Sequence, residues 1–159
     1  MPNNPIEQKI WNAIKAKLVA AQVSGQLLDY VGAGSIFAGI RANIPSGAFP
    51  CILLEPDSVD ESNHSSPNRI LMTSRINITC AIEHMDTDKQ ITGDATTRGI
   101  MDLAADIKNV LGADPKLGIA GDGVLRIRFP STRYFVENYP IREAVITAEV
   151  DATYALDAR

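Results

Sequence analysis

The chain has 159 residues, of which 45% are hydrophobic and 21% are charged, and its formal net charge is -4. These values are typical of one globular domain, residues 1–159, and they exclude a disordered chain because there is enough apolar material for a core. No apolar run approaches the roughly 20 residues that span a membrane, and the acidic balance argues against direct nucleic-acid binding, which needs a basic surface.

The first expected element is an amphipathic helix over Pro5–Ser24, with Gly25 as its end. Its apolar residues recur at four-residue spacing, which predicts one buried face; they are Ile6, Ile10, Ile14 and Leu18. Val31–Ser35 contains two glycines and predicts a flexible loop, without the third glycine of a dinucleotide-binding fingerprint. Ser35–Arg41 is expected to form a short strand.

A strand, a polar segment and a second strand follow. Phe49–Glu55 is an apolar run of strand length. Asp57–Asn68 has a single aliphatic residue, Val59, and therefore predicts a mobile polar loop at about residues 57–69, either a surface loop or a hairpin tip. Ile70–Glu83 alternates apolar and polar residues, the pattern of a strand with one buried face.

The second half of the chain also contains helix and strand patterns. Met85–Thr92 is expected to be a polar connection, and Asp94–Leu111 a second amphipathic helix capped by Asp94. Val124–Phe129 reads as a strand that Pro130 ends, with Tyr134–Val136 as a continuation beyond a bend or bulge. Ile141–Leu156 alternates over more than twice the usual strand length, so we expect it to bend or to project beyond the core.

The order of these elements indicates the fold class. One-sided strands and amphipathic helices bury their apolar faces against each other. We therefore predict an α+β fold with two layers, a mostly antiparallel sheet with two amphipathic helices packed on one face.

The two cysteines, Cys51 and Cys80, each lie in an apolar strand pattern. A buried cysteine behaves as a small hydrophobic residue, so we predict two unpaired thiols. The polar N-terminal residues also predict no secretory signal. Both features are expected of a chain made in a reducing cytoplasm.

No group of residues predicts catalysis. His64 and His84 are the two histidines, and neither adjoins a nucleophile motif. Glu83–Asp88 has ligand-type side chains without the spacing of a metal site. Asp102 and Asp106 share a helix face that we expect to be solvated. The sequence therefore predicts a non-enzymatic protein with no cofactor and no metal.

Arg126 and Arg128 share one face of a predicted strand, where they need charged partners if they are covered. Two interpretations stay open. The partners are cross-strand carboxylates of the same chain, among Glu143, Glu149 and Asp151, or they belong to a neighbouring subunit.

The chain resembles phage tail terminator (tail completion) proteins, which are minor tail proteins of α+β fold. The likeness rests on the order of its elements over most of the chain: the helix Ile6–Ala21, the strand entered through Phe49–Pro50, the polar loop and long strand Ile70–Glu83, the helix Thr97–Leu111, and the strand Val124–Phe129 with its late partner Ile141–Tyr154.

The resemblance implies a structural protein of a phage or prophage tail, assembled in the bacterial host cytoplasm. Such proteins form a homo-oligomeric ring, usually a hexamer, on the last ring of the tail tube protein. The ring stops tail polymerisation and presents a surface to the head–tail connector protein. Other possibilities are a head–tail joining or other minor tail or neck protein, and a small-molecule-binding module in the groove between helices and sheet.

Two surfaces are candidates for these contacts. We expect a subunit interface in which the arginines of one copy meet carboxylates of the next, with candidates Arg126, Arg128, Glu149 and Asp151. We expect the polar loop to dock on a neighbouring subunit or the tube, with candidates Asp57, Asp60, Glu61, His64 and Arg69.

Overall fold

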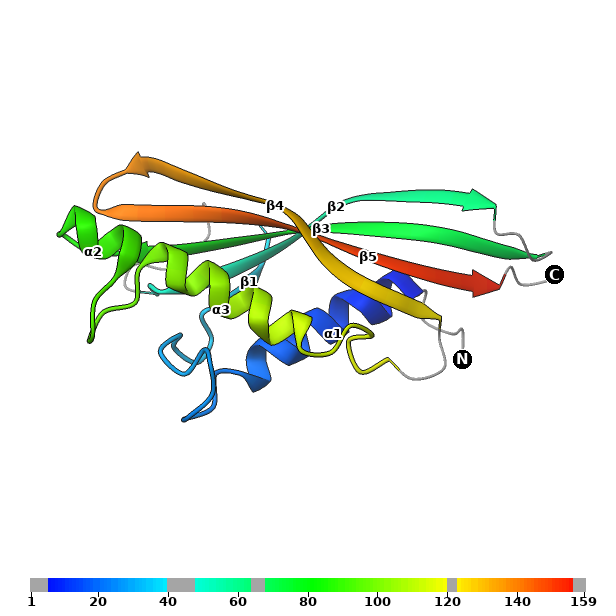
Figure 1. Cartoon of the computed structure of the whole chain (residues 1–159), viewed down its shortest axis with the longest axis horizontal. Helices are drawn as coiled ribbons and strands as arrows, with labels where there is room; N and C mark the ends of the chain where they lie inside the picture. The colour runs from blue at the N-terminus through cyan, green and yellow to red at the C-terminus, as the bar shows by residue number, and fades with distance from the viewer. Residues whose placement is uncertain (1–5, 40–47, 64–67, 120–122, 156–159) are drawn as a thin grey trace.

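The computed structural model describes residues 6–39, 48–63, 68–119 and 123–155, and within them it has an open five-stranded sheet with helices packed against it (Figure 1). In chain order the elements are α1 Ile6–Ala20, β1 Ile36–Ala38, β2 Cys51–Asn63, β3 Arg69–Glu83, α2 Thr87–Thr92, α3 Ile100–Gly112, β4 Val124–Asn138 and β5 Ile141–Ala155. The predicted α+β class is confirmed. The described helices include none with the length and apolar composition to cross a bilayer.

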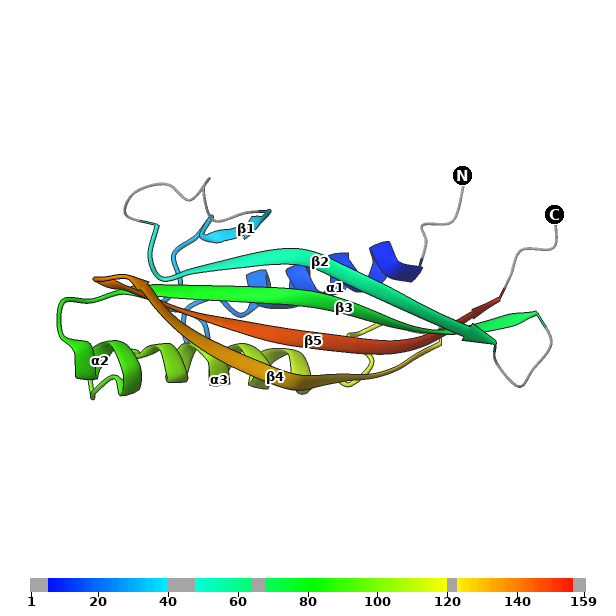
Figure 2. The ribbon, with the colours of Figure 1, turned by 90° about the horizontal axis from the view of Figure 1, so that it is seen from above.

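The strands are arranged in the order β1-β2-β3-β5-β4, with β1 and β4 at the two edges (Figure 2). All neighbours are antiparallel except β1 and β2, which run parallel. The central strands β3 and β5 pair without interruption, from Arg69 opposite Ala155 to Glu83 opposite Ile141. The long C-terminal strand therefore does not project alone, because an equally long partner supplies its hydrogen bonds along a length of about 50 Å.

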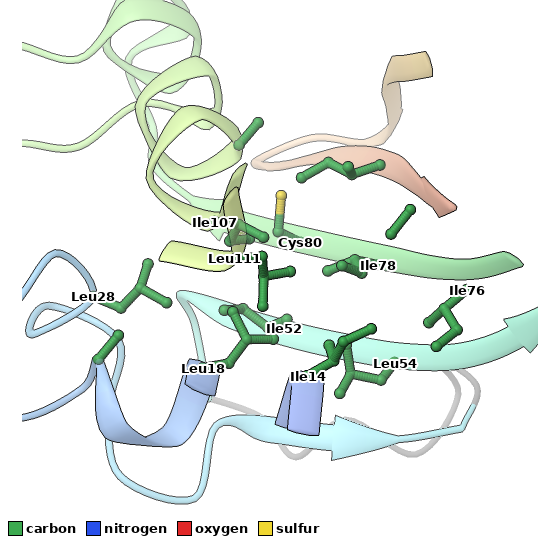
Figure 3. Close-up of a cluster of buried hydrophobic side chains, with 14 of the residues drawn as sticks. Ile14, Leu18, Leu28, Ile52, Leu54, Ile76, Ile78, Cys80, Ile107 and Leu111 are labelled. Atoms are coloured by element: carbon green, nitrogen blue, oxygen red, sulfur yellow. The ribbon is translucent and has the colours of Figure 1, made fainter. Parts of the chain in front are cut away.

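The core lies between the sheet and the helices α1 and α3 (Figure 3). Every second side chain of β3 faces the helices, as its alternation predicted. Ile14 and Leu18 of α1 meet side chains of β2 and α3, and all are fully buried; the partners are Ile52, Leu54, Ile107 and Leu111. Each such side chain contributes roughly 1.5–3 kcal/mol of burial free energy, so the four-residue spacing of α1 fixes its place in the fold.

The helix predicted from Asp94 begins later, at Ile100, and a short helix α2 precedes it in the segment expected to be a polar connection. Asp86 caps α2 by accepting hydrogen bonds from the backbone N–H groups of Asp88 and Lys89. Asp94 instead closes a turn, because its Oδ1 accepts the N–H groups of Thr96 and Thr97 at 2.8 and 2.7 Å. Local hydrogen bonds of this kind compete with helix formation.

The polar segment that begins at Asp57 was predicted to be a surface loop or a hairpin tip, and the loop alternative is wrong for residues 57–63. They belong to β2 and pair with β3, from Ser58 opposite Arg75 to Asn63 opposite Ile70. Their side chains are mostly exposed, so backbone hydrogen bonds to β3, not burial, hold the strand. The mobility expected of residues 57–69 stays a prediction.

The expectation that Pro130 ends the strand is wrong, because β4 continues through it to Asn138. A register shift between Arg128 and Ser131 accommodates the proline within the strand. The cysteines lie on opposite faces of the sheet. Cys80 is in the core under the helices, whereas Cys51 is in a second cluster with Leu53 and Ala81. No disulfide joins them, because side chains that point to opposite faces cannot meet.

Candidate assembly surface

The sheet face away from the helices carries two rows of polar side chains that cross four strands. One row is Asp60, Thr73, Asp151 and Arg126, and the next is Ser58, Arg75, Glu149 and Arg128. We call these eight residues the polar ladder. The rows form because the strand registers place residues from β2, β3, β5 and β4 directly beside each other.

Two carboxylates lie at the centre of the polar ladder. Asp151 accepts hydrogen bonds from Thr73 Oγ1 at 2.7 Å and from Arg126 Nε at 2.9 Å. Glu149 Oε1 accepts from Arg75 Nε at 2.9 Å, and its Oε2 lies 2.8 Å from Arg128 Nη2. Both carboxylate residues are only 8% exposed although they belong to the open face. The surrounding side chains therefore cover them.

Charge is balanced inside the polar ladder. Arg128 also lies 3.4 Å from Asp151, and Arg75 also pairs with Asp60 on β2. Three arginines thus match three carboxylates. Burial raises the pKa of Asp151, but the hydrogen bonds from Arg126 and Thr73 and the charge of Arg128 outweigh it, so its pKa falls below the ordinary value.

The structure brings together all four residues expected at a subunit interface, but it pairs them within one chain. Arg126 and Arg128 meet Asp151 and Glu149 across β4 and β5, which is the first of the two interpretations left open by the sequence. Glu143, the third candidate, faces Phe135 in the β4 register. The arginine side chains remain 64% and 45% exposed, so they still present a surface outward.

The candidate docking residues are divided between the two sheet faces. Asp60 belongs to the polar ladder, and Asp57 lies exposed at the register shift of β2. Glu61 accepts a hydrogen bond at 2.9 Å from the hydroxyl of Tyr154. Arg69 Nη2 donates to Thr153 Oγ1 at 2.9 Å. His64 lies outside the described residues. They therefore do not form one continuous patch.

Asp106 was expected to be solvated, but it is buried. It is 8% exposed, and its Oδ2 accepts a hydrogen bond at 2.7 Å from the hydroxyl of Tyr30. Burial and this hydrogen bond raise the pKa of Tyr30. Asp102 instead caps α3, because it accepts the backbone N–H of Gly99 at 3.0 Å. Both aspartates serve the fold, and no sequence signal marked Tyr30 as a partner.

The described residues line two open grooves at the helix layer, of about 310 and 300 Å³. The first is lined by Glu7, Gln8, Trp11, Pro56, Ser74 and Ile76. The second has Lys17 as its one ionisable lining residue. Of the described lining residues, neither groove has two titratable groups that could divide acid and base roles. Among the described residues no group of three or more metal-ligand side chains occurs.

Comparisons with known proteins find a similar fold among solved structures. No protein-family model matches the sequence, and a search of curated proteins finds no similar sequence. Among solved structures, the chain is similar to a chain of the "Virion of native gene transfer agent (GTA) particle", with a TM-score of 0.58 and 14% identity. The alignment covers 89% of this chain and 92% of that chain. At this identity the likeness shows a shared fold.

Proposed function

We propose that this chain is a non-enzymatic structural subunit of a phage-like virion, and that its copies form a ring that ends the tail tube. The observation that carries the proposal is the fold match, over 89% of this chain and 92% of the other, with a chain of a gene transfer agent virion.

The polar ladder supports an assembly role. Within the described parts of the chain, its residues lie on a sheet face that carries no helix, and β1 and β4 are the two edge strands. An open edge is a surface that another chain can cover. Copies joined head to tail through such surfaces form a ring when the rotation between neighbours closes after a whole number of copies. The arrangement that we propose is a hexamer that caps the last ring of the tube protein and presents a surface to the head–tail connector protein.

Tail length in particles made without the protein tests this function. Without a terminator, tube subunits continue to add, so electron microscopy should show tubes of uncontrolled length that carry no heads. Restoring the gene in the same host should restore the normal length. Tails of normal length that fail to join heads would assign the chain to head–tail joining instead. Normal particles would overturn both roles.

A further inference from the structure

The two edges of the sheet carry opposite charge. Beyond Leu54, where pairing with β1 ends, the outer side of β2 has no neighbouring strand within the described residues. Glu55, Asp57 and Asp60 are exposed along this stretch, and Glu55–Asn63 contains no basic residue. We call these three residues the acidic edge. On the opposite side of the sheet, β4 is the last strand and exposes the arginine edge, Arg126 and Arg128.

The charges are placed in matching rows. Arg126 lies in the same row as Asp60, and Arg128 lies in the same row as Ser58, next to Asp57. Antiparallel pairing between each of β2, β3, β5 and β4 means that β4 runs opposite to β2. If a second copy were placed beside the first in the same orientation, its β2 would run antiparallel to β4 of the first, and the rows of the polar ladder would line up from one copy to the next.

Prolines and register shifts limit how the edges can meet. β2 shifts register between Pro56 and Ser58, and β4 shifts between Arg128 and Ser131 around Pro130. A proline lacks the N–H that extends a sheet, and bulges discourage edge pairing. A contact between these edges would therefore be made by side chains and not by an unbroken backbone ladder. The same features protect the isolated subunit against unlimited strand addition.

We infer that the acidic edge of one copy lies against the arginine edge of the next, so that the ring is held in register by charge. This inference rests on the ring of the proposed function and names the surfaces that build it. The contact is heterologous, since each copy offers two different edges, and it closes into a ring or grows as a filament according to the rotation. Charge at such a contact sets register and orientation.

The outward contact of the arginines does not require their inner pairs to break. Arg126 uses Nε toward Asp151, and Arg128 uses Nη2 toward Glu149 and Asp151. A guanidinium has five N–H donors in a fixed fork, so donors remain for a second carboxylate. Replacing both arginines with glutamate is a poor test, because it would place four carboxylates together in one chain and destabilise the subunit.

Cross-linking in assembled particles tests the contact directly. Asp57→Cys and Leu125→Cys place thiols on the two edges, at an exposed position of β2 and a half-exposed position of β4. The natural cysteines are fully buried. A bismaleimide should join the double variant into a ladder of covalent multimers that ends at the ring size. Each single variant, and the control pair Glu83→Cys with Leu125→Cys, should give no ladder.

The outcomes separate the two proposals. A variant present in particles that gives no ladder would overturn the edge contact and leave the ring in place. Absence of the wild-type protein from particles would overturn the proposed function and the edge contact together.

A charge reversal tests the electrostatic part. Asp57→Lys should reduce incorporation into particles by at least about tenfold, because it sets like charges opposite each other. Glu83→Lys makes the same charge change at an exposed residue that lies at the end of a central strand, and it should incorporate within about twofold of wild type. Equal incorporation of the two variants would show that charge does not hold the edges.

Discussion

Asp151 combines burial with several charged donors, and both properties follow from its row in the sheet. In the sequence it is one polar residue in an alternating strand. In the structure Thr73 and Arg126 flank it from the neighbouring strands. Removing a buried acceptor of charged hydrogen bonds costs more than removing an exposed partner, because water can solvate an exposed arginine but cannot easily reach the centre of the ladder.

We predict that Asp151→Asn lowers the free energy of unfolding at pH 7 by about 1–3 kcal/mol. The lowered pKa of Asp151 in the fold means that its carboxylate stabilises the protein fully above the unfolded value, about 3.9, and progressively less as pH falls through the folded value. Wild type should therefore lose more stability than the variant below about pH 4. Urea denaturation at pH 7 and pH 3 measures both effects. Glu83→Gln changes an exposed position, so its free energy of unfolding should equal that of wild type at both pH values.

Cys80 should be chemically inert in the native protein. Burial, with a smaller contribution from Cys51, raises its pKa to about 12, so almost no thiolate forms at pH 8. Native protein treated with iodoacetamide at pH 8 should keep Cys80 unmodified by mass spectrometry. Denatured, non-reduced protein should show two titratable thiols. Rapid native modification of Cys80 would contradict its position in the core.

At the scale of the elements, the turn between α2 and α3 depends on two glycines that approach each other closely. A Cβ on Gly99 would lie 2.5 Å from the backbone nitrogen of Gly93 and 2.5 Å from the carbonyl oxygen of Ile91. Gly93 itself has a φ of +69°. The close approach lets Gly99 begin α3 with its N–H held by Asp102, so the start of this helix is set by packing between backbones.

We predict that Gly99→Ala destabilises the fold by about 1–3 kcal/mol, because backbone atoms must move to admit the methyl group. Gly112→Ala is the matched control. Gly112 is the last residue of α3, and its nearest neighbour to an added Cβ is Phe129 at 3.8 Å, an ordinary contact. This control should be neutral or stabilising by up to about 1 kcal/mol, since alanine favours a helix. Thermal unfolding of the two variants measures the difference. A Gly99→Ala variant that is as stable as Gly112→Ala would contradict the prediction.

At the scale of the whole molecule, residues 57–69 connect the fold to the proposed assembly. Beyond Leu54, the strand part of this segment pairs on one side, with β3, and no other described strand lies on its outer side. A segment with exposed side chains and one row of partners opens more readily than the central pair β3 and β5. A neighbouring copy on the acidic edge would cover its other side.

We predict that limited proteolysis cuts isolated subunits first within residues 57–69, and that assembled particles resist cleavage there. Mass spectrometry of the fragments locates the cut. Cleavage at β3 or β5 should follow only after global unfolding in both samples. Equal cleavage of residues 57–69 in free and assembled protein would remove the argument that a partner covers this segment.

Local periodicity was enough to predict much of the architecture. The spacing of Ile10, Ile14 and Leu18 predicted α1 and its buried face, and the alternation in β3 and β5 predicted long one-sided strands. These patterns are local, because a helix or a strand repeats its side-chain direction every few residues. The α+β class followed from them.

Strand register and remote partners were decided only by the tertiary structure. Arg126 and Asp151 lie 25 residues apart, and Tyr30 and Asp106 lie 76 apart; no local pattern relates such positions. β2 extends through a polar segment because β3 supplies its backbone partners, which is a property of the neighbour. The same sheet order places the acidic edge and the arginine edge on opposite sides of the sheet. Side-chain periodicity could not predict this arrangement, because it depends on which strands pair across the fold.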